Sequence, residues 1–261
     1  MTSLIHNVKP PSDWIEIQKQ IRTSIIEQDD TALIPLTHIG GVDISFIKHT
    51  NEALSAFVVM TWPELEIVHQ DYRTVTMTEP YISGYLAFRE VNHLAVLIND
   101  LKRSNPSIYP QVIMVDGNGI LHPTRCGLAS HLGVVCDVAT IGIGKNLLQV
   151  DGITQETINE WKKTQTSLDV LQNRTLPLIG TSSGILYGAA LCISNVQKPI
   201  YVSVGHRISL QRCLEITIQC SEFRIPTPIR AADLGSREIL REREKERKQT
   251  GAALMRLEMF E

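Results

Sequence analysis

Two aspartates stand where apolar, strand-like runs stop or thin out, and they are the residues best placed to do chemistry. The run Val112–Val115 ends at Asp116, which Gly117 and Gly119 follow closely, and Asp43 lies inside a second such run. A carboxylate at the end of a buried strand needs a cation or hydrogen-bond donors beside it. Each aspartate could be an ordinary turn or capping residue, but together they suggest a site for a divalent metal ion.

Composition limits the classes of protein to which the chain can belong. Its 261 residues are 43% hydrophobic and 20% charged, with a net charge of −3. This balance is typical of a soluble globular protein, and it requires any nucleic-acid surface to be local or dependent on metal. The five cysteines show no zinc-like spacing, and no apolar stretch could span a membrane. We expect a reduced, monomeric protein of the cytoplasm, the nucleus or both, without membrane contact.

Hydrophobic periodicity divides the chain into helices and strands. The expected helices are Asp13–Gln28, Gly84–Lys102, Arg125–Val134, Thr154–Gln172, Ser209–Cys220 and Arg230–Lys248. The expected strands are His38–Lys48, Ala53–Thr61, Glu66–Thr74, Gln111–Val115, Val138–Ile143, Thr175–Ile179, Gly184–Ile193 and Pro199–Val204. Short turns join the first three strands, which predicts an antiparallel meander. The strand–helix–strand alternation after it predicts parallel neighbours.

This order of elements predicts an α/β ribonuclease H-like fold, in which helices flank a central mixed sheet of three antiparallel strands followed by parallel ones. The first and fourth strands lie side by side in that topology, so Asp43 and Asp116 become neighbours. Glu90, on the helix after the meander, is then well placed as a third carboxylate, although a surface role is its alternative. Carboxylates grouped in this way can bind two divalent metal ions, which stabilise the attacking and leaving oxygens when a phosphodiester is hydrolysed. Phosphodiester hydrolysis is therefore the chemistry that these residues favour.

No linker-like tract interrupts the chain, so we expect one catalytic domain over residues 12–240. Residues 241–261 are expected to form a charged, flexible tail. Acidic and basic residues are mixed between Ser236 and Lys248. A solvated helix that frays is favoured there over a basic arm that grips RNA, because the glutamates nearly cancel the arginines.

Several long motifs closely resemble the endonuclease V family, in the wording of its animal branch. They are Gly40–Phe46 (GGVDISF), Pro80–Glu90 (PYISGYLAFRE), Val115–Pro123 (VDGNGILHP), Ile141–Lys145 (IGIGK), Val204–Arg207 (VGHR) and Phe223–Asp233 (FRIPTPIRAAD). The resemblance covers roughly residues 12–240. It implies that Asp43, Glu90 and Asp116 form the catalytic, metal-binding set, with Mg²⁺ as the cofactor and Mn²⁺ as an expected substitute.

Three further residues have both a catalytic and an ordinary interpretation. The resemblance places His206 and Asp233 near the site, but His206 could cap a helix and Asp233 could be an exposed helix residue. Lys145 follows a glycine-rich run, yet Asn146 stands where a phosphate-binding loop needs Ser or Thr, and the leading glycine is missing. A phosphate-binding loop is therefore excluded, and a contact from Lys145 to a phosphate or a water is favoured.

The resemblance also implies how a substrate base is recognised. The segment Pro80, Tyr81, Ile82 and Ser83 resembles the family's wedge, on which a base can stack. The pocket for a base turned out of its stack is expected near Gly84, Leu86, Gly117, His122, Gly127 and Leu148. Tyr81 could instead be a packed rim aromatic and His122 a plain turn residue. Zinc is excluded, because His122 has no suitably spaced partner.

The function implied is an Mg²⁺-dependent endoribonuclease that recognises inosine in single-stranded RNA. It would hydrolyse the second phosphodiester on the 3′ side of the inosine and leave 5′-phosphate and 3′-hydroxyl ends. A repair endonuclease for deoxyinosine in DNA is the alternative, because no motif visibly reads the 2′-hydroxyl. A non-catalytic inosine-binding module is a third possibility, against which the intact acidic residues argue.

Overall fold

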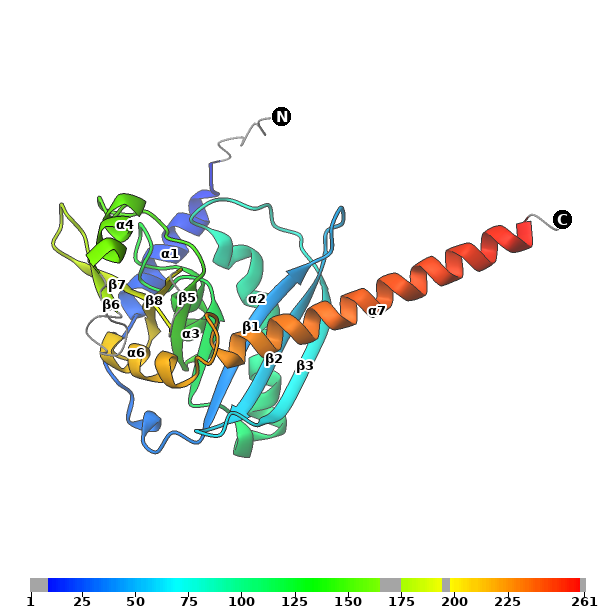
Figure 1. Cartoon of the computed structure of the whole chain (residues 1–261), viewed down its shortest axis with the longest axis horizontal. Helices are drawn as coiled ribbons and strands as arrows, with labels where there is room; N and C mark the ends of the chain where they lie inside the picture. The colour runs from blue at the N-terminus through cyan, green and yellow to red at the C-terminus, as the bar shows by residue number, and fades with distance from the viewer. Residues whose placement is uncertain (1–8, 165–174, 194–197, 259–261) are drawn as a thin grey trace.

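A mixed eight-stranded sheet runs through the centre of the computed structural model, which describes residues 9–164, 175–193 and 198–258, with side chains up to residue 245 (Figure 1). Its strands are β1 (His38–Phe46), β2 (Glu52–Thr61), β3 (Ile67–Thr76), β4 (Val112–Asp116), β5 (Ala139–Gly144), β6 (Thr175–Ile179), β7 (Leu186–Leu191) and β8 (Ile200–His206). The helices are α1 (Ser12–Ser24), α2 (Leu86–Ser104), α3 (Leu128–Cys136), α4 (Gln155–Thr164), α6 (Leu210–Gln219) and α7 (Thr227–Glu258), with short 3-10 turns at Thr31–Leu33 and Pro106–Ile108.

The strand order is β3-β2-β1-β4-β5-β8-β7-β6. The first three strands pair antiparallel, β1 pairs parallel with β4, and β4 pairs parallel with β5. The predicted meander, the parallel neighbours and the adjacency of the first and fourth strands are all confirmed. The mixed α/β sheet flanked by helices is therefore the fold that the sequence predicts.

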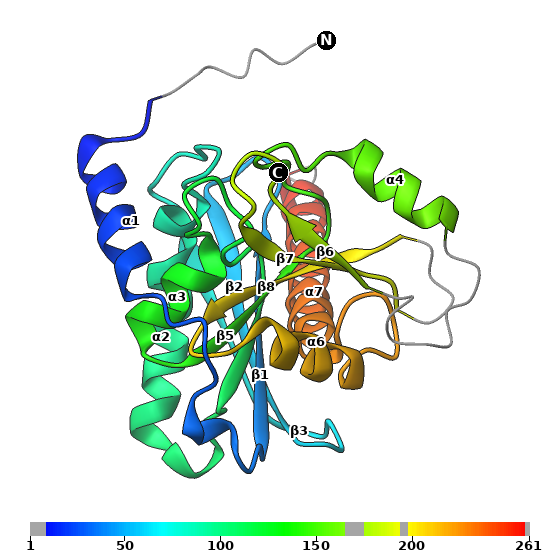
Figure 2. The ribbon, with the colours of Figure 1, turned by 90° about the vertical axis from the view of Figure 1, so that its left-hand side faces the viewer.

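Helices cover both faces of the sheet, so its central strands are buried on each side (Figure 2). Along β4, Val112 and Met114 pack on the face covered by α6 and α7, while Ile113 and Val115 pack on the face covered by α2 and α3. This alternation is the two-residue period of a strand. It explains why the strand is apolar without interruption until Asp116. No helix in the described ranges has the length and apolar character needed to cross a membrane.

Helices α2, α3 and α6 lie within three residues of their predicted bounds at each end, and the other three helices differ as follows. Helix α1 ends at Ser24 rather than at residue 28, because the chain after it pairs with the end of β8: the amide of Arg207 donates to the carbonyl of Ile26. Helix α4 covers the start of its predicted range, and residues 165–172 of that range lie outside the described residues. Helix α7 begins three residues before the predicted start at Arg230 and keeps a helical backbone to Glu258.

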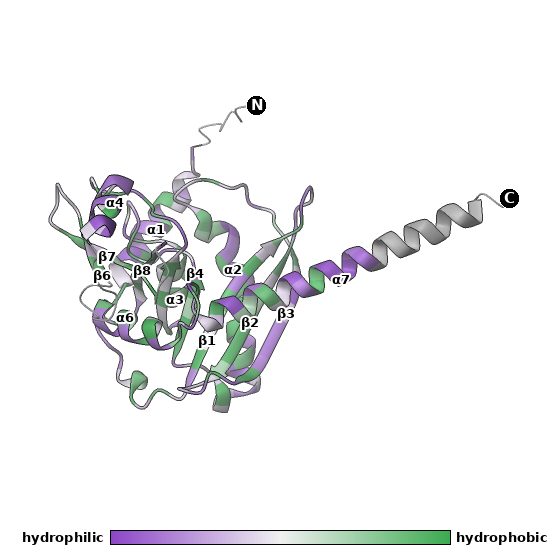
Figure 3. Ribbon diagram, in the orientation of Figure 1, coloured by the Kyte–Doolittle hydropathy of each residue, from purple (hydrophilic) through white to green (hydrophobic). Residues whose placement is uncertain are grey.

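Helix α7 therefore crosses the expected boundary at residue 240 without interruption. It packs across β1 and β2 and then projects away from the body of the protein (Figure 1). Its projecting part is strongly hydrophilic up to the limit of the described side chains (Figure 3). Its first turn lies so close to β1 that a Cβ atom at Gly41 would be 2.2 Å from the carbonyl carbon of Pro228.

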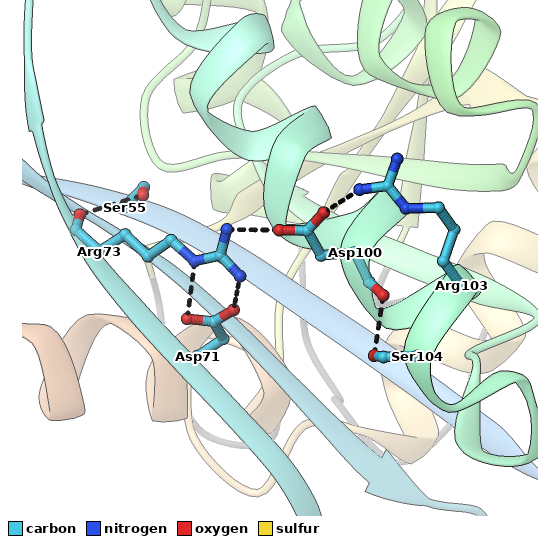
Figure 4. Close-up of polar contacts among 6 residues, drawn as sticks. All are labelled: Ser55, Asp71, Arg73, Asp100, Arg103 and Ser104. Atoms are coloured by element: carbon cyan, nitrogen blue, oxygen red, sulfur yellow. Dashed lines mark hydrogen bonds and ion pairs between the residues drawn. The ribbon is translucent and has the colours of Figure 1, made fainter.

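The exposed edge strand β3 is held to helix α2 by a group of ion pairs (Figure 4). Arg73 on β3 pairs with Asp71 on its own strand and with Asp100 on α2, at 2.5 Å to each carboxylate. Asp100 also accepts from Arg103. Exposed pairs of this kind stabilise a fold by about 1 kcal/mol or less each, so the network orients the edge rather than holding the core together.

Candidate functional site

The acidic site begins with Asp43 and Asp116, which the sheet places side by side. Val42 on β1 pairs with Val115 on β4, so the next residue of each strand is the aspartate. Asp43 is 8% exposed, and its carboxyl group lies close enough to that of Asp116 for the two to repel each other. Burial and the repulsion from Asp116 raise the pKa of Asp43 to about 7.

Glu90 reaches the same place from the first turns of α2, on the face of the helix turned toward the sheet. Its side chain is buried, and burial raises its pKa to about 8, with added repulsion from Asp43 and Asp116. The predicted third carboxylate is therefore brought to the pair. The raised pKa values of Asp43 and Glu90 mean that these two groups favour protons unless a cation balances their charge.

Lys145 supplies one compensating charge. It follows the last residue of β5, whose parallel pairing with β4 brings it to the same edge, and its ammonium group forms an ion pair with Asp116. Burial alone would lower the pKa of Lys145, but the carboxylates of Asp116 and Asp43 raise it on balance. The side chain is thus held as a cation that can donate to an anionic group.

Asp233 joins the site from α7. It lines the same cleft as Asp43, Asp116 and Lys145, and its carboxylate pairs with Arg237 at 2.6 Å. Two serines tie this helix to β1: Ser45 and Ser236 share a hydrogen bond of 2.7 Å, and Ser45 also donates to Asp43 at 3.5 Å. Helix α7 is therefore a wall of the acidic cleft.

The cleft has a volume of about 320 Å³ and a donor set made of carboxylate oxygens. Such oxygens are the ligands that Mg²⁺ and Mn²⁺ prefer. Within the described part of the chain, no three Asp, Glu, His or Cys side chains are already arranged to hold a metal ion. The donor chemistry fits a hard divalent cation, and the ion pair of Lys145 with Asp116 balances part of the negative charge.

The structure does not bring His206 to this cleft, which corrects the placement implied by the motifs. On β5, His206 pairs with Thr140, whereas Asp116 pairs with Ile143, three residues further along the strand. That separation is roughly 10 Å, toward the opposite edge of the sheet. The Nδ1 atom of His206 accepts from the amide of Ile26 at 3.2 Å, so this histidine fixes the segment before β1.

A second, smaller pocket of about 120 Å³ lies beside the acidic cleft. Five of the residues expected at the base pocket line it, and so do two residues of the wedge segment: Gly84, Leu86, His122, Gly127 and Leu148, with Tyr81 and Ser83. Burial lowers the pKa of His122 to about 4, so its ring is neutral at neutral pH. Its Nδ1 accepts from the amide of Thr124 at 3.3 Å, which leaves Nε2 as the donor on the side facing Gly84.

Two glycines are required by the shape of this pocket. A Cβ atom at Gly127 would lie 2.3 Å from the carbonyl oxygen of Asn118, so a side chain there would push the two walls apart. Gly84 has a φ angle of +82°, which other residues rarely adopt. Backbone groups thus form much of the lining.

Three expected substrate residues, Pro80, Ile82 and Gly117, lie around the pocket rather than in its lining. Tyr81 is 67% exposed at the pocket rim, and Pro80 is exposed beside it, whereas Ile82 is buried and faces the protein interior. Gly117 lies beneath Leu128, whose side chain would be 3.1 Å from a Cβ atom at that glycine. Gly117 therefore acts on the pocket through Leu128, which does line it.

Sequence reasoning missed the lining residue Asn118. It stands two residues after Asp116, and its side-chain oxygen is buried without a hydrogen-bond partner among the described residues. Unpaired polar atoms of this kind are rare in folded proteins. The sequence did carry a signal for Asn118. It is the first polar residue after Asp116, which ends a strand, so it lies close to the acidic cleft and to the pocket beside it.

A basic groove of about 790 Å³ also went unpredicted. Helix α7 and the turn after β1 line it, and its charged residues are Lys48, Arg237, Arg241, Arg243 and Glu244. Phe46, Arg237 and Leu240 line both this groove and the acidic cleft. The mixed charges of the tail conceal the groove in the sequence, because only one face of α7 is turned toward it.

A sheet of this order, with acidic residues near the ends of its first and fourth strands, places the chain among nucleases of the ribonuclease H-like class. More narrowly, the family model of Endonuclease V matches residues 19–234, and the chain belongs to the endonuclease V family. Human Endonuclease V is 40% identical over 245 residues, which cover 89% of this chain and 85% of the human protein. Mouse Endonuclease V is 41% identical over 246 residues, which cover 89% of this chain and 71% of the mouse protein.

Solved structures agree with this assignment. The catalytic domain of human Endonuclease V superimposes with a TM-score of 0.82 at 40% identity, covering 90% of this chain and 99% of that one. A Ciona intestinalis Endonuclease V superimposes with a TM-score of 0.83 at 36% identity, covering 88% and 97%. That protein was crystallised with a 23mer DNA containing an inosine followed by a ribo-adenosine.

Proposed function

We propose that this protein is a Mg²⁺-dependent endoribonuclease that recognises inosine and hydrolyses the second phosphodiester on its 3′ side. The products would carry 5′-phosphate and 3′-hydroxyl ends. The observation that carries the proposal is the short segment from Asp116 to Asn118, which joins the acidic cleft to the neutral pocket. A base held in the pocket would therefore place its own strand near the carboxylates.

The pocket suits a single flat, uncharged group. Its volume of about 120 Å³ is roughly four times a water's share of the liquid. Hypoxanthine presents a carbonyl acceptor and a ring N–H donor where adenine has an amino group. The neutral ring of His122 can donate to that carbonyl, and backbone carbonyls of the glycine-rich lining can accept from that N–H.

In the cleft, Asp43, Glu90 and Asp116 would hold the metal ion. A bound Mg²⁺ neutralises charge on a phosphate and activates a water for attack. Lys145 can donate to a non-bridging phosphate oxygen once Asp116 is engaged elsewhere, and the ion pair of Asp233 with Arg237 orients the α7 side of the cleft. Tyr81 offers an exposed ring on which the neighbouring base can stack.

The basic groove continues from the cleft and offers cations to the phosphates beyond the cut, which RNA and DNA both carry. One observation favours RNA over DNA. The ligand of the Ciona intestinalis relative carries a ribose directly after its inosine. In this chain that sugar would lie next to the bond to be cut, where its 2′-hydroxyl distinguishes RNA from DNA.

Four labelled single strands of one sequence test the proposal. They are all-RNA with inosine, all-DNA with deoxyinosine, DNA with one ribose directly after the deoxyinosine, and all-RNA with adenosine. We expect Mg²⁺-dependent cleavage of the first and third strands at the second phosphodiester, with much slower cleavage of the other two. End labelling establishes the position of the cut and the chemistry of both ends.

Each departure from that pattern has a defined meaning. Equal cleavage of the all-DNA strand would favour the repair endonuclease for deoxyinosine. Tight binding of inosine RNA without cleavage in Mg²⁺ or Mn²⁺ would favour the binding module. Equal cleavage of the adenosine strand would overturn inosine recognition altogether.

A further inference from the structure

Gln18, on helix α1, joins two walls of the base pocket with a single amide group. Its side chain is 2% exposed, and its Nε2 atom donates to the carbonyl of Gly84 and to the carbonyl of Cys126, at 3.0 Å each. Both acceptors belong to residues that line the pocket. The two carbonyl oxygens cannot be farther apart than twice that distance, so one side chain limits the opening between the walls.

These walls come from separate parts of the chain. Gly84 closes the wedge segment before α2, and Cys126 precedes α3 in the loop after β4. Gly84 also lies next to the ring of His122, whose Nε2 atom would be 3.7 Å from a Cβ atom at that glycine. A shift of Gly84 would therefore move the backbone and a side chain of the pocket together.

Helix α1 is itself held firmly where it carries Gln18. The ring of Trp14, one turn earlier, stacks on Phe88 of α2 with centroids 4.7 Å apart and planes 5° apart. Phe88 in turn lies edge-on to His131 of α3. Residues 14 and 18 are four apart and so share a face of α1. The stacking of Trp14 on α2 therefore also holds the side-chain amide of Gln18 at a fixed distance from α2.

We propose that Gln18 is a positioning residue that sets the width of the base pocket and so its discrimination between inosine and adenosine. The inference rests on the proposed function, because it assigns this pocket to the base. Gln18 contacts neither the acidic cleft nor its lining, so its contribution lies in binding and selectivity rather than in the chemical step. It also precedes the range 19–234 that matches the family model.

The test compares Gln18→Met with wild type and with Gln20→Met. Methionine keeps the length of glutamine but has no donor, so both carbonyls lose their partner. Gln20 is exposed on the same helix, which makes its substitution the matched control. We expect Gln18→Met to raise KM for inosine RNA about tenfold and to lower the inosine-to-adenosine ratio of kcat/KM about tenfold, with kcat within about twofold.

Circular dichroism and thermal melting establish that the variants are folded. If Gln18→Met does not fold, Gln18→Asn decides by the same two ratios, because it keeps the amide but is too short to reach both carbonyls. Wild-type values of KM and selectivity in the folded variant would overturn the proposal, as would an equal loss on inosine and adenosine strands. If wild type itself shows no preference for inosine, the proposed function fails first, and the role of Gln18 falls with it.

Discussion

The acidic cleft and the base pocket are neighbours, yet they are built in opposite ways. The cleft stands on strands that place Asp43 beside Asp116, with Glu90 close by on α2, and burial and mutual repulsion raise the pKa values of Asp43 and Glu90. The pocket is made of loops, but its polar groups are neutral and mostly paired with one another. Charge is concentrated in the cleft and almost absent from the pocket.

The difference indicates that the acidic cleft and the base pocket have separate roles in the reaction. A stiff sheet can hold like charges together that loops would let drift apart, and the resulting repulsion gives the cleft its affinity for a cation. Base discrimination depends on the pairing of neutral hydrogen-bond donors and acceptors. Loops whose own polar groups are hydrogen bonded can position these donors and acceptors. Changes in the cleft should therefore alter rate and pH dependence, and changes in the pocket should alter selectivity.

The largest expected effect is on the rate of cleavage. Asp43→Asn removes one carboxylate from the cleft and should lower kcat on inosine RNA by a factor on the order of 10³, comparable to the loss of a major electrostatic group. Inosine-RNA binding, measured by fluorescence anisotropy, should change less than about threefold, because the pocket is intact. Asp13→Asn, at an exposed site on α1, is the control. Wild-type cleavage by the cleft variant would remove Asp43 from the mechanism.

The next effect is on stability without metal. Folded Glu90 has a pKa raised to about 8, so between its ordinary value near 4.5 and pH 8 the folded protein keeps a proton that the unfolded chain has released. Stability should therefore fall as pH rises through this window. Glu90→Gln should raise Tm by roughly 5 °C at pH 8.5 in EDTA and by almost nothing at pH 4.5. Calorimetry at both pH values tests this, with the exposed Glu16→Gln as reference; an equal gain at both would contradict it.

A smaller effect should come from the rim of the pocket. Tyr81→Ala removes an exposed ring and should lower kcat/KM on inosine RNA about tenfold, within the range that base stacking supplies. Tyr81→Phe should stay near wild type, because stacking needs the ring and not the hydroxyl. Single-turnover rates on the same oligonucleotide decide between the two. A large loss in the phenylalanine variant would mean that the hydroxyl, not the ring, contacts the substrate.

The smallest effect is expected in the basic groove. Arg241→Ala should weaken RNA binding by about two- to fivefold at low salt and reduce the slope of log K against log salt by about one. Selectivity for inosine should be unchanged, because the groove meets phosphates. Binding titrations at several salt concentrations measure both quantities. An altered inosine preference would show that the groove reads more than backbone charge.

The acidic cleft was largely predictable from sequence because strand periodicity and topology act on it directly. An apolar run that stops at Asp116 and a meander that brings β1 beside β4 determine where Asp43 and Asp116 meet. Glu90 followed from the phase of helix α2, whose buried face is apolar except at this residue.

Other parts were hidden because they depend on register between distant segments. His206 occurs in a motif typical of the family, but only the pairing of β8 with β5 shows that it lies about 10 Å from Asp116 along the strands. Helical spacing puts Gln18 on the face of Trp14, but its two hydrogen bonds depend on how α1 packs against two loops. The basic groove likewise requires the direction in which α7 leaves the sheet.

Helix α7 carries Asp233, Arg237, Leu240 and Arg241 at intervals of one and two turns along one continuous rod. A helix advances by 100° per residue, so a single inserted residue between Asp233 and Arg237 would rotate everything beyond it by more than a quarter turn. The groove would then face away from the cleft, although each side chain remained present. Chain length in this stretch is therefore under tighter constraint than residue identity, and a deletion scan would expose it where alanine scanning would not.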